Sequence, residues 1–361
     1  MATQLDPAYT EGPVRPGWIN VRSDVVTLPT EEMFDAIRQA KLGDDNAGQD
    51  PTVNRLEAMA AEKLGKEAAL LLTSGTMGNL VGLMAHTERG QEVIVEEYAH
   101  IFTSEQGGAA AIGGLMLSRV KGSKGCPLPE AVEAAIRPDD IHAPRTGLIC
   151  LENTHNRAGG TVIGPEQISA IRAVADRHGL PVHIDGARFF NAAVALGLPA
   201  KDLVRDADSV TLCLSKGLSC PAGAVLVGSR PYIERARRLR KLLGGSTRQA
   251  GIIAAPGVVA LESMIDRLAE DHRNARRLAE GLAKISCLAL DLDTVQTNIV
   301  RVNVAPSGLT AAEFAARLRS FNVEVSVQGK TIMRLVTHRH IGPSHVEEVI
   351  AACRRVAEQI G

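Results

Sequence analysis

The chain has 361 residues, which is long enough for a large domain and a smaller second one. Its 40 Lys+Arg nearly balance its 41 Asp+Glu, and only 3% of its residues are aromatic, so nothing supports nucleic acid or an anionic membrane as a main partner. Six scattered cysteines without a C-x-x-C pair favour reduced thiols over a disulfide framework or a zinc site. There is neither a signal-peptide core nor an apolar run of membrane-spanning length, so we expect a soluble cytoplasmic protein.

The first segments in chain order are an arm and two helices. Residues 1–30 begin with a polar, proline-bearing stretch and are expected to form an N-terminal arm. A helix is then predicted from about residue 30, with Met33, Ile37 and Leu42 on roughly one face. A second helix is predicted over residues 51–65, because a proline opens it and a glycine ends it.

From residue 68 on, short apolar runs alternate with helical segments. The expected strands are residues 68–72, 92–95, 115–120, 146–151, 181–185, 209–214 and 222–227. The clearest helix, over residues 165–178, begins with a proline and shows apolar residues at helical spacing. This alternation predicts an α/β domain with a mostly parallel sheet that helices cover on both faces.

The pattern changes towards the C-terminus. After a loop at residues 244–249, a long helical stretch is expected to run into the 270s. Valines then alternate with polar residues at 300–304 and 323–327, which is typical of strands with one solvated face. We therefore expect a large domain over residues 31–265 and a smaller α+β domain over residues 266–361.

Two of the expected strands end in residues suited to Schiff-base chemistry. One ends at Asp185, with Arg188 three residues later, and the other is followed by Ser215 and Lys216. The carboxyl ends of parallel strands meet at one rim of a sheet, so these residues should lie together. A partly desolvated lysine is a nucleophile, and a carboxylate can keep a pyridine nitrogen protonated so that the ring accepts electrons. An arginine offers a bidentate fork to a carboxylate.

Each of these residues also has a simpler explanation. Lys216 could be a surface charge, Asp185 a turn former or a metal ligand, and Arg188 only its ion-pair partner. His100 and His155 both follow apolar runs, where a lone histidine is more often structural than catalytic. No H-x-x-H or H-E-x-x-H pattern occurs, so we predict no metal.

A phosphate-binding turn is expected at Ser74, Gly75 and Thr76, which join a strand to a helix. Free backbone N–H groups and hydroxyls at a helix N-terminus can cradle an anion. The pattern alone is weak, because many such turns look alike. The nucleotide signatures G-x-x-x-x-G-K-[ST] and G-x-G-x-x-G are absent.

Eight segments spread over nearly the whole chain form a recognisable series. They are Val21–Pro29, Gly43–Asp45, Asp50–Glu57, Ser74–Asn79, Glu152–Arg157, His183–Arg188, Leu214–Gly217 and Arg334–His338. In this order they resemble the low-specificity L-threonine aldolases, which belong to the aspartate-aminotransferase-like (fold type I) pyridoxal-phosphate enzymes. The resemblance implies that fold for the large domain.

The resemblance also implies a role for each site residue. Lys216 would hold pyridoxal 5'-phosphate as a Schiff base, Asp185 would pair with its pyridine nitrogen, and His100 would stack on its ring. The phosphate would be bound by Ser74, Gly75, Thr76 and Ser215, with Arg248 reaching it from a neighbouring subunit. The substrate carboxylate would be held by Ser23, Arg188 and Arg334, and His155 would lie by the β-hydroxyl. Sites shared between subunits imply a homo-oligomer, either a dimer or a tetramer.

The implied reaction is cleavage of an L-β-hydroxy-α-amino acid to glycine and an aldehyde. One alternative keeps the cofactor but catalyses β-elimination or dehydration of a related amino acid. Another, a non-catalytic binding protein, is disfavoured because Lys216, Asp185, His100 and Arg188 are all present.

Two positions depart from the family's pattern. Ala47 stands where the family usually has a pocket tyrosine, and Ser104 stands where a tyrosine often precedes the glutamate, here Glu105. Both changes remove aromatic bulk, so we predict a pocket that accepts substrates bulkier than threonine, such as phenylserine.

Overall fold

The computed structural model describes residues 15–360, which divide into two compact units. The larger unit is Pro29–Asp266, and the smaller joins residues 15–28 to the chain from Arg267 onward. The expected N-terminal arm lies partly in residues 1–14, outside the described residues. No helix within residues 15–360 is long and apolar enough to cross a bilayer.

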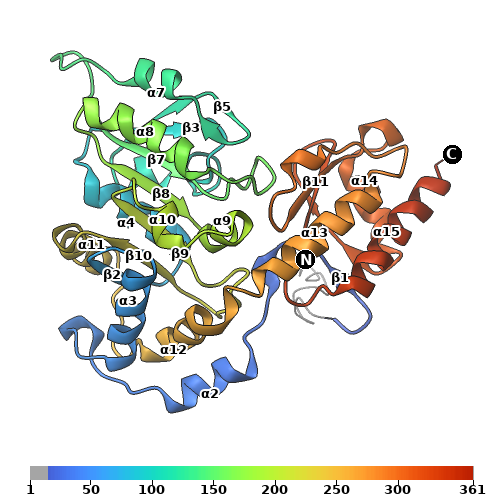
Figure 1. Ribbon diagram of the computed structural model, residues 1–361, viewed down its shortest axis with the longest axis horizontal. Coiled ribbons are helices and arrows are strands. Elements are labelled where there is room, and N and C mark those ends of the chain that lie inside the picture. The colour runs from blue at the N-terminus through green and yellow to red at the C-terminus, as the bar shows by residue number, and fades with distance from the viewer. Residues whose placement is uncertain (1–14, 361) are drawn as a thin grey trace, which may run out of the picture. The chain divides into compact units, whose positions relative to one another are not determined.

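The larger unit is built on a seven-stranded sheet with the order β2-β10-β9-β8-β7-β3-β4. Its strands are β2 Ala68–Leu72, β3 Glu92–Glu96, β4 Met116–Val120, β7 Thr146–Glu152, β8 Val182–Gly186, β9 Ser209–Cys213 and β10 Ala224–Gly228. Every pairing is parallel except the two that β10 makes with β2 and β9. The mostly parallel sheet is therefore confirmed (Figure 1).

Helices cover this sheet because its strands are apolar on both faces. The longer ones are α2 Glu31–Gln39, α3 Pro51–Lys63, α4 Gly75–His86, α7 Pro129–Ala135, α8 Pro165–Arg177, α9 Phe189–Leu196, α11 Arg230–Leu242 and α12 Gly251–Val259. On one face, α4 and α11 bury Leu70, Leu72 and Leu226 in one apolar cluster. Shorter elements lie near the sheet ends: η2 Asp45–Ala47, α5 His100–Thr103, α6 Gly108–Ala111, α10 Ala200–Leu203, and the hairpin of β5 Gly122–Ser123 and β6 Cys126–Pro127.

The smaller unit is an α+β arrangement. Its three-stranded antiparallel sheet has the order β11-β14-β13, and β1 pairs with β12 in parallel. Its elements are β1 Ile19–Asn20, η1 Asp24–Val26, α13 Leu268–Leu282, η4 Leu292–Thr294, β11 Ile299–Asn303, η5 Ala305–Ser307, α14 Ala311–Arg319, β12 Val323–Glu324, β13 Ser326–Val327, β14 Ile332–Val336 and α15 Pro343–Glu358. One core joins them, with Leu278, Val302, Phe314 and Val349 fully buried.

Two predicted helical segments are shorter than expected. The first begins after its cap Thr30, whose hydroxyl accepts from the Met33 N–H, and ends at Gln39. Leu42 therefore lies beyond the helix and is 45% exposed. The stretch expected to run into the 270s is also interrupted, because a π-helical turn at Ala260–Met264 separates α12 from α13.

The alternation expected at residues 323–327 is confirmed at two valines and wrong at two other positions. The segment is split between two sheets, with β12 paired to β1 and β13 paired to β14. Val323 and Val325 are buried as predicted, but Glu324 is also buried and Val327 is 43% exposed. The Glu324 carboxylate lies 3.9 Å from Arg22 and 3.5 Å from Arg319, and these arginines compensate for its burial.

Candidate functional site

The carboxyl ends of four adjacent parallel strands bring most of the predicted site residues of the larger unit to one rim. In the register of the sheet, Asp185 at the end of β8 pairs with Glu152 of β7 on one side and with Thr211 of β9 on the other. Lys216 follows β9 by three residues, His100 begins α5 after β3, and His155 follows β7. The strand order therefore explains why residues distant in the chain converge.

Asp185 is a buried carboxylate whose partners are neutral. It is 2% exposed. Its Oδ2 accepts from Asn79 Nδ2 over 3.0 Å, and its Oδ1 accepts from the Ala187 N–H over 3.1 Å. Among the described residues it forms no ion pair with a cationic side chain. A buried carboxylate in this state fits a cationic group on a ligand, such as a protonated ring nitrogen.

His100 is tied to the same cluster through Glu105. Its Nδ1 lies 2.8 Å from Glu105 Oε1, and this hydrogen bond raises the pKa of His100. Burial raises the pKa of Glu105. The three potential ligand atoms of His100, Glu105 and Asp185 lie within 4.8 Å of one another. The Asn79 amide nitrogen donates to both carboxylates, however, and an N–H donor in that position does not suit a cation.

The predicted phosphate cradle lies at the start of α4. Ser74 caps this helix, and its hydroxyl accepts from the Met77 N–H over 3.2 Å. The first N–H groups of a helix have no intrahelical partners, so they are available to an anion. A Cβ added at Gly75 would lie 3.8 Å from the Cys213 side chain, which places the cradle beside the end of β9. Ser215 follows Cys213 by two residues.

His155 is enclosed, with both ring nitrogens engaged. It is 1% exposed, its Nε2 lies 2.9 Å from Glu96 Oε2, and its Nδ1 accepts from the Ala158 N–H over 3.1 Å. Burial opposes protonation, but the Glu152 and Glu96 carboxylates outweigh it and raise the pKa of His155. A second proton, on Nδ1, would nevertheless displace the Ala158 N–H, so this conformation holds the neutral ring with its proton on Nε2.

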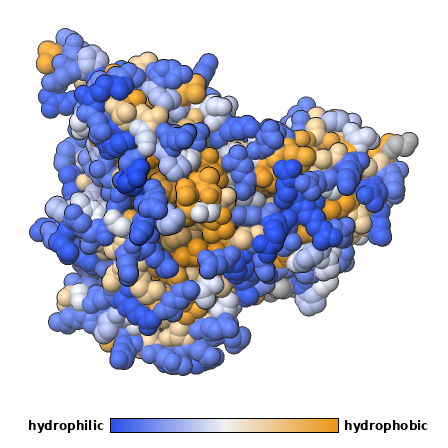
Figure 2. Space-filling model, viewed as in Figure 1, coloured by the Kyte–Doolittle hydropathy of each residue, from blue (hydrophilic) through white to orange (hydrophobic). Residues whose placement is uncertain are grey.

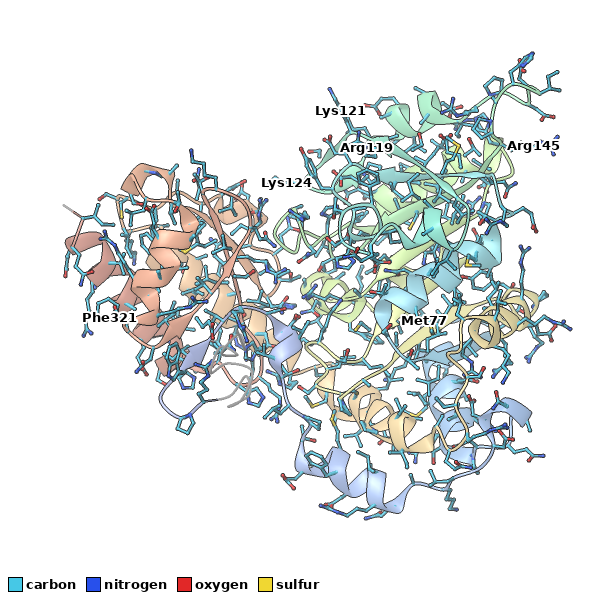
Figure 3. The ribbon with its side chains drawn as sticks, turned by 180° about the vertical axis from the view of Figure 1, so that it is seen from behind. Met77, Arg119, Lys121, Lys124, Arg145 and Phe321 are labelled. Carbon is cyan, nitrogen blue, oxygen red and sulfur yellow. The ribbon has the colours of Figure 1, made fainter. Side chains whose placement is uncertain are left out.

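The β5–β6 hairpin covers His155. Any side chain at Gly125 would overlap the His155 ring. The Lys124 carbonyl accepts from the Thr161 hydroxyl over 2.6 Å, which fixes the hairpin to the loop after β7. Lys124 and Lys121 are exposed around this hairpin (Figure 3). The hairpin also packs against Glu96, because a Cβ at Gly122 would lie 2.8 Å from the Glu96 side chain, so it covers both His155 and its carboxylate partner.

Glu152 has a structural role that the sequence analysis missed. One of its oxygens accepts from the His100 N–H over 2.6 Å, and the other accepts from the Asn156 N–H over 2.8 Å. It therefore joins the loops that carry the two histidines. Glu96 likewise ends a buried strand and accepts from the Tyr98 N–H over 2.6 Å. An acidic residue at the last position of an apolar strand is the sequence signal that could have identified both.

Two predicted substrate residues belong to the smaller unit. Ser23 caps η1, where its hydroxyl accepts from the Val25 N–H. Arg334 donates from Nη2 to the Arg22 carbonyl over 3.2 Å, so it lies next to the Ser23 segment. Arg188, the third predicted carboxylate ligand, is 7% exposed in the larger unit and directly precedes α9.

Arg248 lies in a loop that packs against the turn at Asp44 and Asp45, near the N-terminal end of the larger unit. Its guanidinium is 66% exposed and lies 3.1 Å from the Asp44 carboxylate. The Arg248 carbonyl accepts from the Asp45 N–H, in the turn that also carries the exposed Ala47. A Cβ at Gly245, in the same loop, would overlap Met77 in the first turn of α4, which Figure 3 labels. The loop therefore lies beside the phosphate cradle.

Comparisons with known proteins agree with this arrangement. The family model described as beta-eliminating lyase matches residues 20–305. The chain is 43% identical to the low specificity L-threonine aldolase of Escherichia coli, over 93% of this chain and 98% of that protein. It is 42% identical to low-specificity L-threonine aldolase 1 of Arabidopsis thaliana, over 92% and 94%.

Solved structures show the same fold at low sequence identity. A threonine aldolase of Leishmania major superposes with a TM-score of 0.80 at 20% identity, covering 95% of this chain and all of that chain. A serine palmitoyltransferase of Sphingomonas wittichii gives a TM-score of 0.75 at 19% identity, covering 95% and 88%. These likenesses confirm the fold type I architecture.

Proposed function

The chain belongs to the beta-eliminating lyase family and, within it, to the low-specificity L-threonine aldolases, and on this premise we propose that it cleaves L-β-hydroxy-α-amino acids to glycine and an aldehyde. Membership makes it a pyridoxal-phosphate-dependent carbon–carbon lyase. The observation that carries the proposal is the buried Asp185, which has only neutral hydrogen-bond donors around it and so matches a protonated pyridine nitrogen.

The residues that would hold the cofactor surround this carboxylate. In the proposal, Lys216 binds it covalently, Asp185 faces its ring nitrogen and His100 stacks on its ring. Its phosphate lies against the α4 N-terminus and is held by Ser74, Gly75, Thr76 and Ser215. When bound, pyridoxal phosphate supplies the electron sink for breaking the bond between the α- and β-carbons.

The substrate would be oriented through its carboxylate. Ser23, Arg188 and Arg334 are the proposed ligands, and two arginines can hold a carboxylate through paired hydrogen bonds. Fixing the carboxylate selects the bond that stands perpendicular to the ring. Orientation of this kind favours cleavage of one bond over the others at the same α-carbon.

A proton must leave the β-hydroxyl during cleavage, and His155 is proposed to lie beside this group. Its Nδ1 lone pair is taken by the Ala158 N–H and its Nε2 proton faces Glu96, which argues against direct transfer to this ring. We therefore infer transfer through a water molecule, with His100 as the second histidine available to accept the proton.

The pocket is proposed to accept substrate side chains larger than that of threonine in addition to threonine itself. Ala47 and Ser104 are both exposed small residues at positions where the family often has aromatic side chains. Acceptance of phenylserine as well as threonine and allo-threonine is expected. β-Elimination remains the alternative reaction, and it gives a keto acid and ammonia in place of glycine and an aldehyde.

A homo-oligomer, most simply a homotetramer in the cytoplasm, completes the proposal. Figure 2 shows apolar side chains gathered on the larger unit over α9, where a hollow of about 870 Å³ is lined by residues including Phe190, Val194 and Leu198. Exposed apolar surface of this kind favours association. Arg248, in an exposed loop, is proposed to reach the phosphate of a neighbouring subunit.

The test is direct. Purified protein is expected to be yellow with bound cofactor, and Lys216→Ala should abolish release of glycine and aldehyde from threonine and phenylserine. Lys241→Ala, an exposed lysine on α11, is the control and should retain full activity. A colourless protein with full aldolase activity, or a keto acid and ammonia as the products, would contradict the proposal.

A further inference from the structure

A continuous chain of hydrogen bonds connects His100 to Asp185. His100 Nδ1 lies 2.8 Å from Glu105 Oε1, Asn79 Nδ2 donates to that same oxygen over 2.8 Å, and Asn79 Nδ2 also donates to Asp185 Oδ2 over 3.0 Å. Asn79, Glu105 and Asp185 are 3%, 8% and 2% exposed, whereas a third of the His100 side chain is accessible. Three buried groups therefore anchor one accessible ring.

The number of donors decides where the protons lie. The Asn79 amide has two hydrogens, and its two contacts are both with carboxylate oxygens. The opposite amide orientation would set its oxygen against both carboxylates, so the nitrogen must face them. With the Glu105 carboxyl ionised, its Oε1 accepts from Asn79 and also from His100, which places a hydrogen on His100 Nδ1.

We propose that Glu105 and Asn79 are positioning residues that hold a proton on His100 Nδ1 and join this ring to the Asp185 carboxylate, so that Nε2 is the nitrogen that exchanges protons with the substrate. The role of Nε2 rests on the proposed function. The position of the proton does not, because it can be measured in the cofactor-free protein.

The negative charges of Glu105 and Asp185 also favour a proton on His100. The hydrogen bond to Glu105 is the main reason that the pKa of His100 is raised, and the Asp185 charge adds to it. A cationic ring nitrogen placed against Asp185 offsets part of that charge. Binding of pyridoxal phosphate should therefore lower the pKa of His100 towards its usual value, even though the two groups are joined only through Glu105 and Asn79.

Glu105→Leu gives a sharp test. It removes the oxygen that accepts from both Asn79 and His100 and fills the same buried space, so no group holds the ring proton on Nδ1. A neutral imidazole without such an acceptor favours the proton on Nε2. Nitrogen-15 NMR of the imidazole in cofactor-free protein distinguishes these tautomers. We expect Nδ1–H in the wild type and Nε2–H in Glu105→Leu, together with a lower pKa of His100 in the variant.

Glu97→Leu is the matched control, because it makes the same change just beyond β3, at a half-buried residue outside the cluster. It should leave the tautomer and the pKa of His100 unchanged. An Nε2–H tautomer in the wild type overturns the proposal even if Glu105→Leu does not fold. The same tautomer in the wild type and in a folded Glu105→Leu also overturns it.

The loaded enzyme separates this proposal from the proposed function. Glu105→Leu should lower kcat about 100-fold, the usual contribution of a general base, with KM little changed. If the tautomer shifts as expected while Lys216→Ala keeps its activity, the aldolase proposal fails and the proton assignment stands. If Lys216→Ala is inactive but the tautomer does not move, only the positioning role fails.

Discussion

At the end of α5, Ser104 presents only a hydroxyl, which lies 3.0 Å from the hydroxyl of Thr103. The residue follows His100 by four positions and is exposed, so a larger side chain here would occupy space near that ring. We predict that Ser104→Tyr lowers kcat/KM for phenylserine about tenfold or more, while the value for threonine changes less than about threefold.

Steady-state kinetics with both substrates checks this prediction. Ser123→Tyr, which adds the same bulk at an exposed position on the β5–β6 hairpin, should leave both values near those of the wild type. A wild-type enzyme that strongly prefers threonine, or a Ser104→Tyr variant that treats both substrates alike, would show that Ser104 does not limit the pocket.

At the scale of elements, the free edge of β2 is protected by two side chains. Within residues 15–360, β2 pairs with no strand other than β10, so its other edge lacks a strand partner for its backbone groups. Glu57 of α3 accepts from the Leu71 N–H over 2.8 Å, and Arg240 donates to the Leu71 carbonyl over 2.9 Å. Glu57 also accepts from Arg237 over 3.0 Å. One residue of α3 thus fixes the edge of the sheet and its neighbour α11.

Glu57→Ala should lower the free energy of unfolding by about 1–3 kcal/mol, because it leaves a buried backbone N–H without an acceptor. Glu62→Ala, an exposed position on the same helix, should change it by less than about 0.5 kcal/mol. Urea unfolding of the two variants provides the comparison. If Glu57→Ala is as stable as the wild type, the Leu71 N–H does not need the Glu57 carboxylate, and water must replace it as the acceptor.

The elements that the sequence predicted well have strong local signals. Helices α3 and α8 begin at prolines, and β2, which packs against α3, is a continuous apolar run. The division of residues 323–327 between two sheets was missed, because the arginines that compensate for Glu324 come from other segments. The antiparallel direction of β10 likewise depends on the whole sheet rather than on its own sequence.

The site shows the same division between local and distant information. Parallel pairing of β8 with β9 puts the segments of Asp185 and Lys216 on one rim, as the strand pattern predicts. The Asn79 contacts join residues that are 26 and 106 positions apart, and no local pattern encodes them. The sequence could therefore predict that the segments of Asp185 and Lys216 lie close together. It could not predict that the Asn79 side chain orients Asp185 and Glu105.

At the scale of the whole molecule, histidines with lowered pKa values make stability depend on pH, and the half-buried His86 and the buried His183 form one such pair. His86 and His183 share the Ser209 hydroxyl, at 2.6 and 2.7 Å. Burial lowers the pKa of His86 to about 4 and that of His183 to about 3. Both are below the value of about 6.5 for the unfolded chain. Between pH 6.5 and 4 the unfolded state therefore binds more protons, and stability falls as the pH falls.

We expect each histidine to contribute up to about 1.4 kcal/mol of lost stability per pH unit within this window. In His183→Gln the contribution of this residue is removed, so the stability of the variant should fall less steeply from pH 6 to pH 4.5 than that of the wild type. His142→Gln, at an exposed position, should follow the wild-type slope. Parallel slopes for the wild type and His183→Gln in urea unfolding would contradict the prediction.

Arg248 allows the proposed shared site to be tested in the assembled molecule. The residue is 66% exposed, and its loop packs against the turn that contains Asp44. If its guanidinium serves a neighbouring subunit, Lys216→Ala chains should be inactive alone and Arg248→Ala chains only weakly active alone. When they are mixed after partial denaturation, each mixed pair has one site with both native residues, and random pairing restores roughly a quarter of wild-type activity.

Lys216→Ala mixed with Asp185→Asn is the matched control. Both residues belong to the same unit of one chain, so no mixed pair regains a native site, and activity should not recover. Mass spectrometry of the mixtures verifies that mixed oligomers form. If they form from Lys216→Ala and Arg248→Ala chains without any gain in activity, Arg248 acts within its own chain. The loop beside Met77 would then complete the phosphate cradle in the same subunit, since that contact already brings the loop to the α4 N-terminus.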